Sequence, residues 1–354
     1  MLLISVLADH ILPIIYDSFV TLIAVLLILF IFRIKDSGIR ILFFFLPLIK
    51  PFLIIAERLE PHPDYPGSSI VYSGIRLPYL NNTLGWFEDF DTGSKLFINN
   101  INYLLIHTIL LIVLIVLILR WFNLFLFYKK LALEDRMARD EVPLVYRIID
   151  AYSVEIWINP PDISLTHQKY LSPFVVGIKY CTIVLCPNLL EILEHNEKEV
   201  LLHHELSHIK RRDNLIGWVA MILRDMMFFN PFAYIAYLLI RVEQDYGSDK
   251  IVVKHSTRPV KEIARDLLNA IRKLSSFGPA KSATGPVSAF TFITGRFFAQ
   301  HRLKNRIRSI LKNDPLRIKM RIFPRIMMCM LFFIVLILQT VLIIDIGNHY
   351  LYLR

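Results

Sequence analysis

The chain is poor in cysteine and lacks internal repeats, and each absence removes a class of protein. Its 354 residues include only three cysteines, Cys181, Cys186 and Cys329, and no two of them form a Cys-x-x-Cys pair. We therefore expect neither a disulfide framework nor a zinc site built from cysteines. No low-complexity tract or internal repeat is present, so a repeat architecture is not expected either.

Hydrophobic residues, in contrast, are abundant and make up 55% of the sequence, which is high for a soluble domain. The formal net charge is +10, and in a membrane protein an excess of lysine and arginine marks the cytoplasmic loops. Membrane lipids rather than nucleic acid are therefore the expected partners. The first apolar run has no basic segment before it and no small-residue cleavage site after it, so it predicts an anchor rather than a removed signal peptide.

Four apolar segments predict membrane spans. The first, at residues 11–32, is nearly continuous. The second, at residues 41–56, is broken by prolines and predicts a kinked span, with a re-entrant hairpin as the alternative. The third lies at residues 103–127 and the fourth at residues 326–344. We expect no paired charges inside these segments, and their absence disfavours a transporter.

The charges that flank these segments predict their orientation. Residues 57–102 carry more acid than base, whereas lysine and arginine cluster after the first and third spans and before the fourth. By the positive-inside rule, residues 57–102 form an extracytoplasmic loop and residues 128–320 form a membrane-apposed cytoplasmic domain. Residues 1–56 then hold the first two spans, and residues 345–354 form a short outer tail. We expect a multi-pass protein of the cell (plasma) membrane with both termini outside.

The strongest local signal is the segment His204-Glu-Leu-Ser-His208 in the predicted cytoplasmic domain. Two histidines four residues apart share one face of a helix, and two neutral imidazoles at that spacing can hold one zinc ion. Glu205 beside them is suited to act as general base toward a water at the metal. His203 points away from the ligand face and is expected to be structural. The run that ends in Asp213 predicts a solvated end of the helix.

A hydrolytic zinc site needs three protein ligands and one open coordination position. Candidates for the third ligand follow in the acidic segment Arg241–Asp249. Asp245 and Asp249 are four residues apart and share a helix face, so one could bind zinc while the other accepts the free N–H of a ligand histidine. Glu243 is the alternative third ligand, because its side chain is longer. Without the upstream histidines, a solvated acidic helix would explain these acids as well as a metal-binding role does.

The rest of the domain is predicted to be mainly α, with a small β-sheet. Short strands are expected at residues 154–159 and 182–185. Two helices are expected to meet at Phe229-Asn-Pro231 and to pack in the domain core, with a shallow position in the membrane as the alternative. Residues 300–325 are basic with interleaved apolar residues, which predicts an amphipathic helix on an anionic membrane surface.

Several of these pieces carry a family resemblance. In their order along the chain, Ser172–Pro187, the zinc motif, Phe229-Asn-Pro231 and the acidic helix ending in Asp249 resemble the membrane zinc metallopeptidases of the β-lactam sensor-transducer type. That family is related to the CAAX prenyl protease and heat-shock membrane protease family. The resemblance covers roughly residues 10–345. It implies a mainly α, multi-pass membrane protein with an α+β, gluzincin-like zinc domain.

The resemblance also implies roles for single residues. The implied zinc ligands are His204, His208 and Asp245, the implied base is Glu205, and the implied partner of a ligand histidine is Asp249. Asp245 stands where the family has a glutamate, and its side chain is one methylene shorter, so Glu243 stays open as the third ligand. Zincins of this kind receive a peptide by strand addition, so the candidate substrate strand is Thr182, Ile183, Val184 and Leu185, with a plain sheet strand as the alternative.

The resemblance implies an integral membrane zinc endopeptidase that cleaves regulatory or membrane proteins at the cytoplasmic face. The alternative is a non-catalytic membrane receptor or scaffold in signal transduction, which the aspartate at position 245 favours. The chain ends about ten residues after the predicted fourth span, so the penicillin-binding sensor domain of the antibiotic receptors is not expected. The expected partner is a protein or peptide substrate, and the sequence does not specify the oligomeric state.

Overall fold

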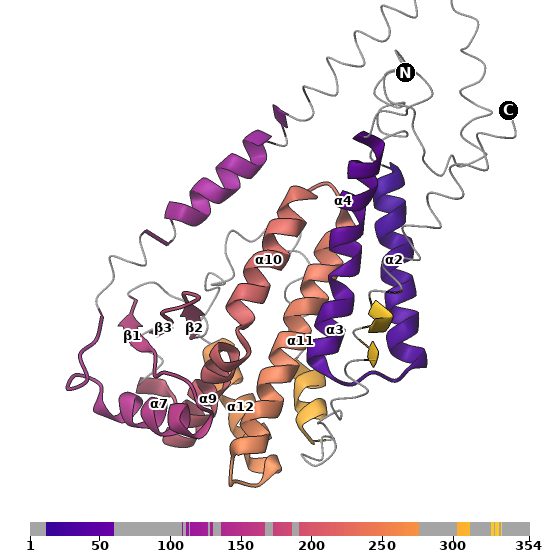
Figure 1. The fold of residues 1–354 in the computed structure, drawn as a ribbon. Coiled ribbons are helices and arrows are strands. Elements are labelled where there is room, and N and C mark those ends of the chain that lie inside the picture. Colours follow the sequence, from indigo (N-terminus) through magenta and orange to yellow (C-terminus); the bar gives the residue numbers. More distant parts are fainter. Residues whose placement is uncertain are drawn as a thin grey trace, which may run out of the picture.

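The computed structural model describes most of residues 1–56, which hold the first two predicted spans, and most of residues 128–320, the predicted zinc domain. The described residues are 12–59, 136–166, 173–185, 191–275 and 303–311, most of 108–129 and parts of 327–334. Within them the chain is mostly helical and has one small mixed sheet, as predicted (Figure 1). Most of the predicted outer loop and fourth span, and the whole outer tail, lie outside the described residues.

Helix α2 (Leu12–Ile31) coincides with the first predicted span. Of the helices in the described part of the chain, it alone is long and apolar enough to cross a bilayer, over Ile14–Ile31. Helices α3 (Ser37–Phe44) and α4 (Leu46–Leu59) follow it, one above the other, and lie beside α2 in Figure 1. The second apolar segment is therefore helical with one interruption at Phe45, which is the geometry of a kinked helix.

A buried ion pair joins α2 to α4 and corrects the expectation that the spans contain no paired charges. The Lys50 ammonium donates to the Asp17 carboxylate, and each side chain is less than one-tenth exposed. Lys50 also lies 3.4 Å from the hydroxyl of Thr21. The two charges are 33 residues apart in the sequence, so their pairing depends on how the helices pack and leaves no local pattern.

Helices α10 (Asp213–Met226) and α11 (Pro231–His255) form the predicted helix pair. Pro231 occupies the first turn of α11, where its missing N–H removes no helical hydrogen bond, and Asn230 caps the helix by accepting from the Phe232 amide. The Asn230 amide also donates to the hydroxyl of Ser18 in α2, over 2.7 Å. The pair shares one hydrophobic core with α2, α3 and α4, so it packs against the predicted spans.

Helix α9 (His195–Arg211) carries the zinc motif and lies at the centre of the predicted cytoplasmic domain. Its Leu202 and Leu206 pack against α7 (Pro143–Glu155) and the sheet, while Val200 on another face packs against α12 (Val260–Ser275). The sheet has the order β1-β3-β2. In it β1 (Asp162–Leu165) is parallel to β3 (Thr182–Leu185), and β2 (Phe174–Val176) is antiparallel to β3.

One of the two predicted strands is wrong. Residues 182–185 form β3, but α7 continues through the start of the segment 154–159, and Trp157 follows in a left-handed conformation with φ 58°. Ile149, Tyr152 and Ile156 recur at helical spacing and are buried together against α9 and the sheet. The helical spacing of these buried residues determines the structure at the start of this segment, and the local alternation of apolar residues does not.

The basic stretch near the C-terminus also differs from its prediction. Residues 303–311 are helical, and Ile307 and Ile310 pack against α9, α11 and α12 in a shared core. The apolar side of this helix therefore faces the domain rather than a membrane surface. The remainder of the predicted amphipathic helix, at residues 300–302 and 312–325, lies outside the described residues.

Candidate metal centre

Both ends of α9 are held, which fixes the face that carries the two histidines. Glu194 and Glu197 form a capping box at the start of the helix, and Lys273 of α12 pairs with both carboxylates. At the other end, Arg212 adopts a left-handed conformation with φ 56° and turns the chain into α10. His204 and His208 therefore lie one turn apart on the same side of a well-anchored helix.

The ring nitrogens of the two histidines converge on a common point. Nε2 of His208 lies 3.1 Å from Nε2 of His204 and 3.9 Å from Oδ1 of Asp245 in α11. Ligand atoms from the three residues all lie within 4.8 Å of one another. Two nitrogen ligands that are each about 2.0–2.1 Å from one tetrahedral zinc ion lie roughly 3.3 Å apart. The structure thus brings the three predicted ligands together with a spacing that fits zinc.

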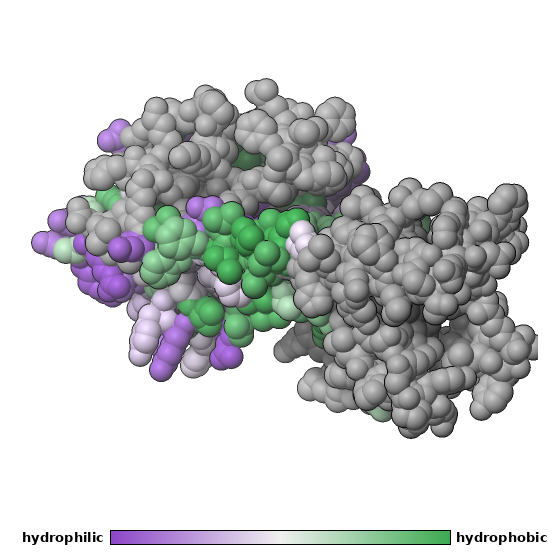
Figure 2. Space-filling model, turned by 90° about the horizontal axis from the view of Figure 1, so that it is seen from above, coloured by the Kyte–Doolittle hydropathy of each residue, from purple (hydrophilic) through white to green (hydrophobic). Residues whose placement is uncertain are grey.

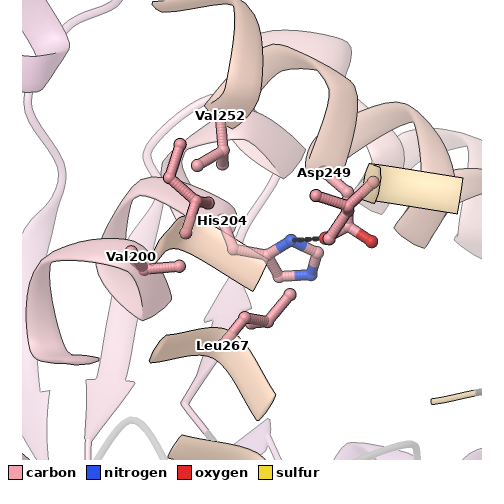
Figure 3. Close-up of a pocket in the computed structure, with 7 residues that line it drawn as sticks. Val200, His204, Asp249, Val252 and Leu267 are labelled. Carbon is pink, nitrogen blue, oxygen red and sulfur yellow. Dashed lines mark ion pairs between the residues drawn. The ribbon is translucent and has the colours of Figure 1, made fainter. Parts of the chain in front are cut away.

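Each histidine has its other ring nitrogen next to a buried carboxylate. Nδ1 of His204 lies 2.9 Å from Oδ1 of Asp249, and the two side chains point toward each other in Figure 3. Nδ1 of His208 lies 2.8 Å from Oδ2 of Asp213. A carboxylate at Nδ1 holds the imidazole proton there and leaves the lone pair of Nε2 available for a metal. Both imidazoles are therefore oriented as metal ligands would be.

Asp213 belongs to the candidate site through its contact with His208, although it follows a basic run that predicts a solvated helix end. Its side chain is only 1% exposed, and it also accepts from Nε of Arg211 over 3.0 Å. The left-handed turn at Arg212 brings the Asp213 carboxylate back under His208. An acid five residues after the second histidine, just beyond the end of the helix, is the signal that points to this role.

Glu205 occupies a buried position beside the histidines. Burial raises the pKa of Glu205 to about 7, against the opposing effect of His208 and with a smaller contribution from the Asp245 charge. A carboxyl group with a pKa near neutrality can both accept and release a proton, as a general base in hydrolysis must. A divalent cation beside it would favour the charged, proton-accepting form.

Glu243, the alternative third ligand, is directed elsewhere. Its Oε1 lies 2.5 Å from Nε of Arg40 in α3, and its side chain is 7% exposed. Residues two apart on a helix differ by roughly 200° in direction, so Glu243 and Asp245 face opposite sides of α11. The structure brings Asp245 to the histidines and pairs Glu243 with Arg40, in the basic segment between the first two predicted spans.

The candidate substrate strand does not lie at an edge of the sheet. Thr182, Ile183, Val184 and Leu185 form β3, which is bonded to β1 on one side and to β2 on the other. Strand addition needs unpaired backbone groups at a sheet edge, so the prediction of a substrate strand at these residues is wrong and they form a plain sheet strand. In the described part of the chain the outer strands are β1 and β2. The side-chain amide of Asn214 ties β2 to α10 by donating to the carbonyls of Val175 and Gly177.

His203 has the structural position that its direction on the helix predicts. Its ring stacks on the ring of Tyr152 in α7, with centroids 3.7 Å apart. Burial lowers the pKa of His203 to about 4, so this imidazole is neutral at physiological pH. It contributes to the packing of α9 against α7.

Comparison with known proteins identifies the group to which this site belongs. The model of the BlaR1 peptidase M56 family matches residues 89–299, which is more than half of the chain. The chain belongs to this family. Membership in the M56 family confirms the resemblance to the membrane metallopeptidases of the sensor-transducer type. The matched residues include the whole zinc motif.

Curated relatives match shorter stretches of the chain. A protease HtpX homolog of Halobacterium salinarum is 35% identical over 86 residues, which are 24% of this chain and 29% of the relative. A protease HtpX homolog of Pyrococcus furiosus is 29% identical over 89 residues, 25% of this chain and 31% of the relative. The methicillin resistance mecR1 protein of Staphylococcus aureus is 29% identical over 83 residues, 23% of this chain and 14% of the relative. The chain matches less than a third of the length of each of these proteins.

Proposed function

We propose that this member of the M56 family is an integral membrane zinc endopeptidase that cleaves regulatory or membrane proteins at the cytoplasmic face. The observation that carries the proposal is the convergence of His204, His208 and Asp245, together with the buried carboxylate at Nδ1 of each histidine. A pair of imidazoles that presents two Nε2 atoms to one point, beside an acid, is the donor set of a catalytic zinc site.

Each side chain has a defined task in peptide hydrolysis. His204, His208 and Asp245 would hold zinc, which when bound supplies a Lewis acid that polarises the scissile carbonyl and makes water more acidic. Glu205 accepts the proton of the attacking water and passes it to the nitrogen of the leaving amine. Asp249 keeps the imidazole of His204 in the orientation that presents Nε2.

Exposed apolar side chains support the membrane location. On α2, Leu27 is 53% exposed and Phe30 is 81% exposed, and on the helix at residues 114–126, Ile118 and Phe125 are 57% and 61% exposed. Such surfaces are unfavourable in water and favourable in lipid. In Figure 2, seen from above, the described hydrophobic side chains gather in one area and hydrophilic ones gather toward one end. The proposed spans are residues 11–32, 41–56, 103–127 and 326–344.

Contacts between α11 and the basic segment that joins the first two predicted spans support a site at the membrane surface. Arg40 pairs with Glu243, and the ammonium of Lys250 donates to the carbonyl of Lys35 over 2.9 Å. The basic connection from α2 to α3 therefore lies beside the turn of α11 that carries the proposed ligand. By the positive-inside rule this connection is cytoplasmic, so the zinc site would face the cytoplasm close to the bilayer, with both termini outside.

The proposal is tested on the purified full chain in detergent micelles. We expect one zinc ion per chain and cleavage of a proteome-derived peptide library, with the new termini read by mass spectrometry. Glu205→Gln should keep the zinc and lose the cleavages, because the variant retains the ligands but has no base. Asp245→Ala should lose zinc, whereas Glu243→Gln should keep it. A wild-type protein without stoichiometric zinc would contradict the proposal.

The alternative is a non-catalytic membrane receptor or scaffold that retains the zinc fold for signal transduction. The observation that favours it is the short side chain of Asp245, whose nearer oxygen lies 3.9 Å from Nε2 of His208. The same experiment separates the two functions. Suppose that the wild type binds one equivalent of zinc and that the wild type and Glu205→Gln give identical peptide products. The cleavages would then not depend on the proposed base, which would support the scaffold.

A further inference from the structure

Arg306 reaches the metal centre from a helix that the zinc motif does not predict. Its Nε lies 2.9 Å from Oδ2 of Asp249 and its Nη2 lies 2.7 Å from Oδ1 of the same carboxylate. These two roughly parallel contacts are the forked geometry that makes arginine–carboxylate pairs strong and directional. The Arg306 side chain is 13% exposed and that of Asp249 is 4% exposed, so little water competes for either group.

The carboxylate held by Arg306 is the one that contacts a proposed ligand. Oδ1 of Asp249 lies 2.9 Å from Nδ1 of His204, so guanidinium, carboxylate and imidazole form a continuous chain. A carboxylate bonded at both oxygens cannot rotate about its terminal bond without breaking a contact. The orientation of the His204 ring therefore depends on a residue 102 positions further along the sequence.

A second contact places the Arg306 guanidinium beside the ligand atom itself. Nη2 of Arg306 lies 3.3 Å from Nε2 of His204, the atom that also faces Nε2 of His208. Nη2 also lies 3.5 Å from Nδ1 of His204, so the guanidinium contacts the ring near both nitrogens and also holds the Asp249 carboxylate that contacts Nδ1.

The helix at residues 303–311 is docked firmly enough to hold Arg306 in place. Its Ile310 is 3% exposed and packs with Val200 of α9, Val252 of α11 and Leu267 of α12. The same four side chains, with His204 and Asp249, line the small pocket in Figure 3. The polar chain of Arg306, Asp249 and His204 is therefore backed by apolar packing, and α9, α11, α12 and this helix all meet there.

We propose that Arg306 is a positioning residue of the zinc site, which orients His204 through Asp249 and thereby sets the affinity of the site for zinc. The inference rests on the proposed function and deepens it. The metal centre would then be completed by the segment that precedes the predicted fourth span, in addition to the motif on α9 and the acids on α11. Removal of groups that orient a metal ligand typically weakens metal binding by about 10- to 100-fold.

The test measures zinc affinity of the full chain in detergent micelles by competition with a chromogenic chelator. We expect Arg306→Ala to weaken zinc binding by about 10- to 100-fold and Arg306→Lys to weaken it less, because a lysine can replace one of the two contacts. Arg308→Ala is the matched control, since Arg308 is exposed on the same helix, and it should bind zinc like the wild type. Cobalt substituted for zinc should show an altered visible spectrum in Arg306→Ala only.

The outcomes separate this inference from the proposed function. If the wild type and Arg306→Ala bind zinc equally and give the same cobalt spectrum, Arg306 has no positioning role. Tighter binding by Arg306→Ala would also overturn the inference, because it would mean that the guanidinium opposes the metal. If the wild type binds no zinc, the proposed function fails. Should Arg306→Ala fail to fold by circular dichroism, Arg306→Lys decides, and wild-type affinity in that variant contradicts the proposal.

Discussion

At the scale of single residues, the proposed zinc site consists of ligands that are each oriented by a second side chain. His204 is held by Asp249, and His208 is held by Asp213. The two aspartates come from different helices and are both buried, and each is also held by an arginine, Asp249 by Arg306 and Asp213 by Arg211. Neither imidazole can turn without losing its short contact to a fixed, buried carboxylate, and these contacts keep both Nε2 atoms directed at one point.

Asp213→Asn tests the support of His208. The asparagine keeps the size of the side chain but loses the charge that favours a proton on Nδ1, so zinc affinity should fall by about 10- to 100-fold. Chelator competition measures the change, and Asp150→Asn is the control, because Asp150 is a partly exposed residue of α7 paired with Arg139. Unchanged zinc affinity in Asp213→Asn would show that His208 needs no support from this carboxylate.

The residues of the site differ in how far the sequence predicts them, for a physical reason. His204, Glu205 and His208 lie within five consecutive residues of one helix, so their spacing alone places them together. Asp213 escapes notice because a left-handed residue, Arg212, redirects the chain between it and the motif. Arg306 is even harder to predict from the sequence, because its contact with Asp249 spans 57 residues and depends on the packing of four helices.

At the scale of elements, α11 connects the predicted spans to the metal centre. Its first turns share a core with α2, α3 and α4, and Asn230 at its start bonds to Ser18 of α2. Its later turns carry Asp245 and Asp249 at the site, and Glu243 between these regions pairs with Arg40. The position of the proposed third ligand thus depends on how α11 packs against α2 and α3.

The buried pair of Asp17 and Lys50 gives the helix bundle a measurable weak point. Lys50→Met leaves the Asp17 carboxylate buried without its partner and should lower the free energy of unfolding by about 3–5 kcal/mol. The double variant Asp17→Leu with Lys50→Met should recover most of that loss, since no buried charge remains. Denaturant unfolding in micelles measures both effects.

The exposed pair of Arg139 and Asp150 is the control for this prediction, because its side chains are 64% and 37% exposed. Arg139→Met should change the free energy of unfolding by about 1 kcal/mol or less. Equal effects of Lys50→Met and Arg139→Met would show that the α2–α4 pair is not buried in the protein in micelles.

The elements themselves were predictable where one strong local signal decides the structure. Asn230-Pro231 marks the start of α11, and the β-branched run at residues 182–185 forms a strand. Residues 154–159 were predicted wrongly, since a six-residue window cannot show that their apolar side chains continue the helical period of α7. The central place of β3 in the sheet was also not predictable, because strand order depends on contacts between distant segments.

At the scale of the whole molecule, the proposed arrangement is a bundle of spans with the zinc site at its cytoplasmic end. Single cysteines in a background with all three native cysteines replaced by serine test this topology. Ser68→Cys in the predicted outer loop should react with a membrane-impermeant maleimide in intact cells. Thr257→Cys, at an exposed position after α11, should react only after the cells are permeabilised. The reverse pattern would place the zinc site outside.

The central claim is that His204, His208 and Asp245 bind one zinc ion, and X-ray absorption at the zinc edge on the purified full chain tests it most directly. We predict a tetrahedral spectrum with two imidazole nitrogens at about 2.0–2.1 Å and only nitrogen and oxygen ligands. In His208→Ala and Asp245→Ala the zinc should be lost or its imidazole or oxygen scattering reduced, and in Glu243→Gln the spectrum should be that of the wild type. Absence of zinc from the wild type, sulfur in its coordination shell, or a changed spectrum in Glu243→Gln alone would contradict the account.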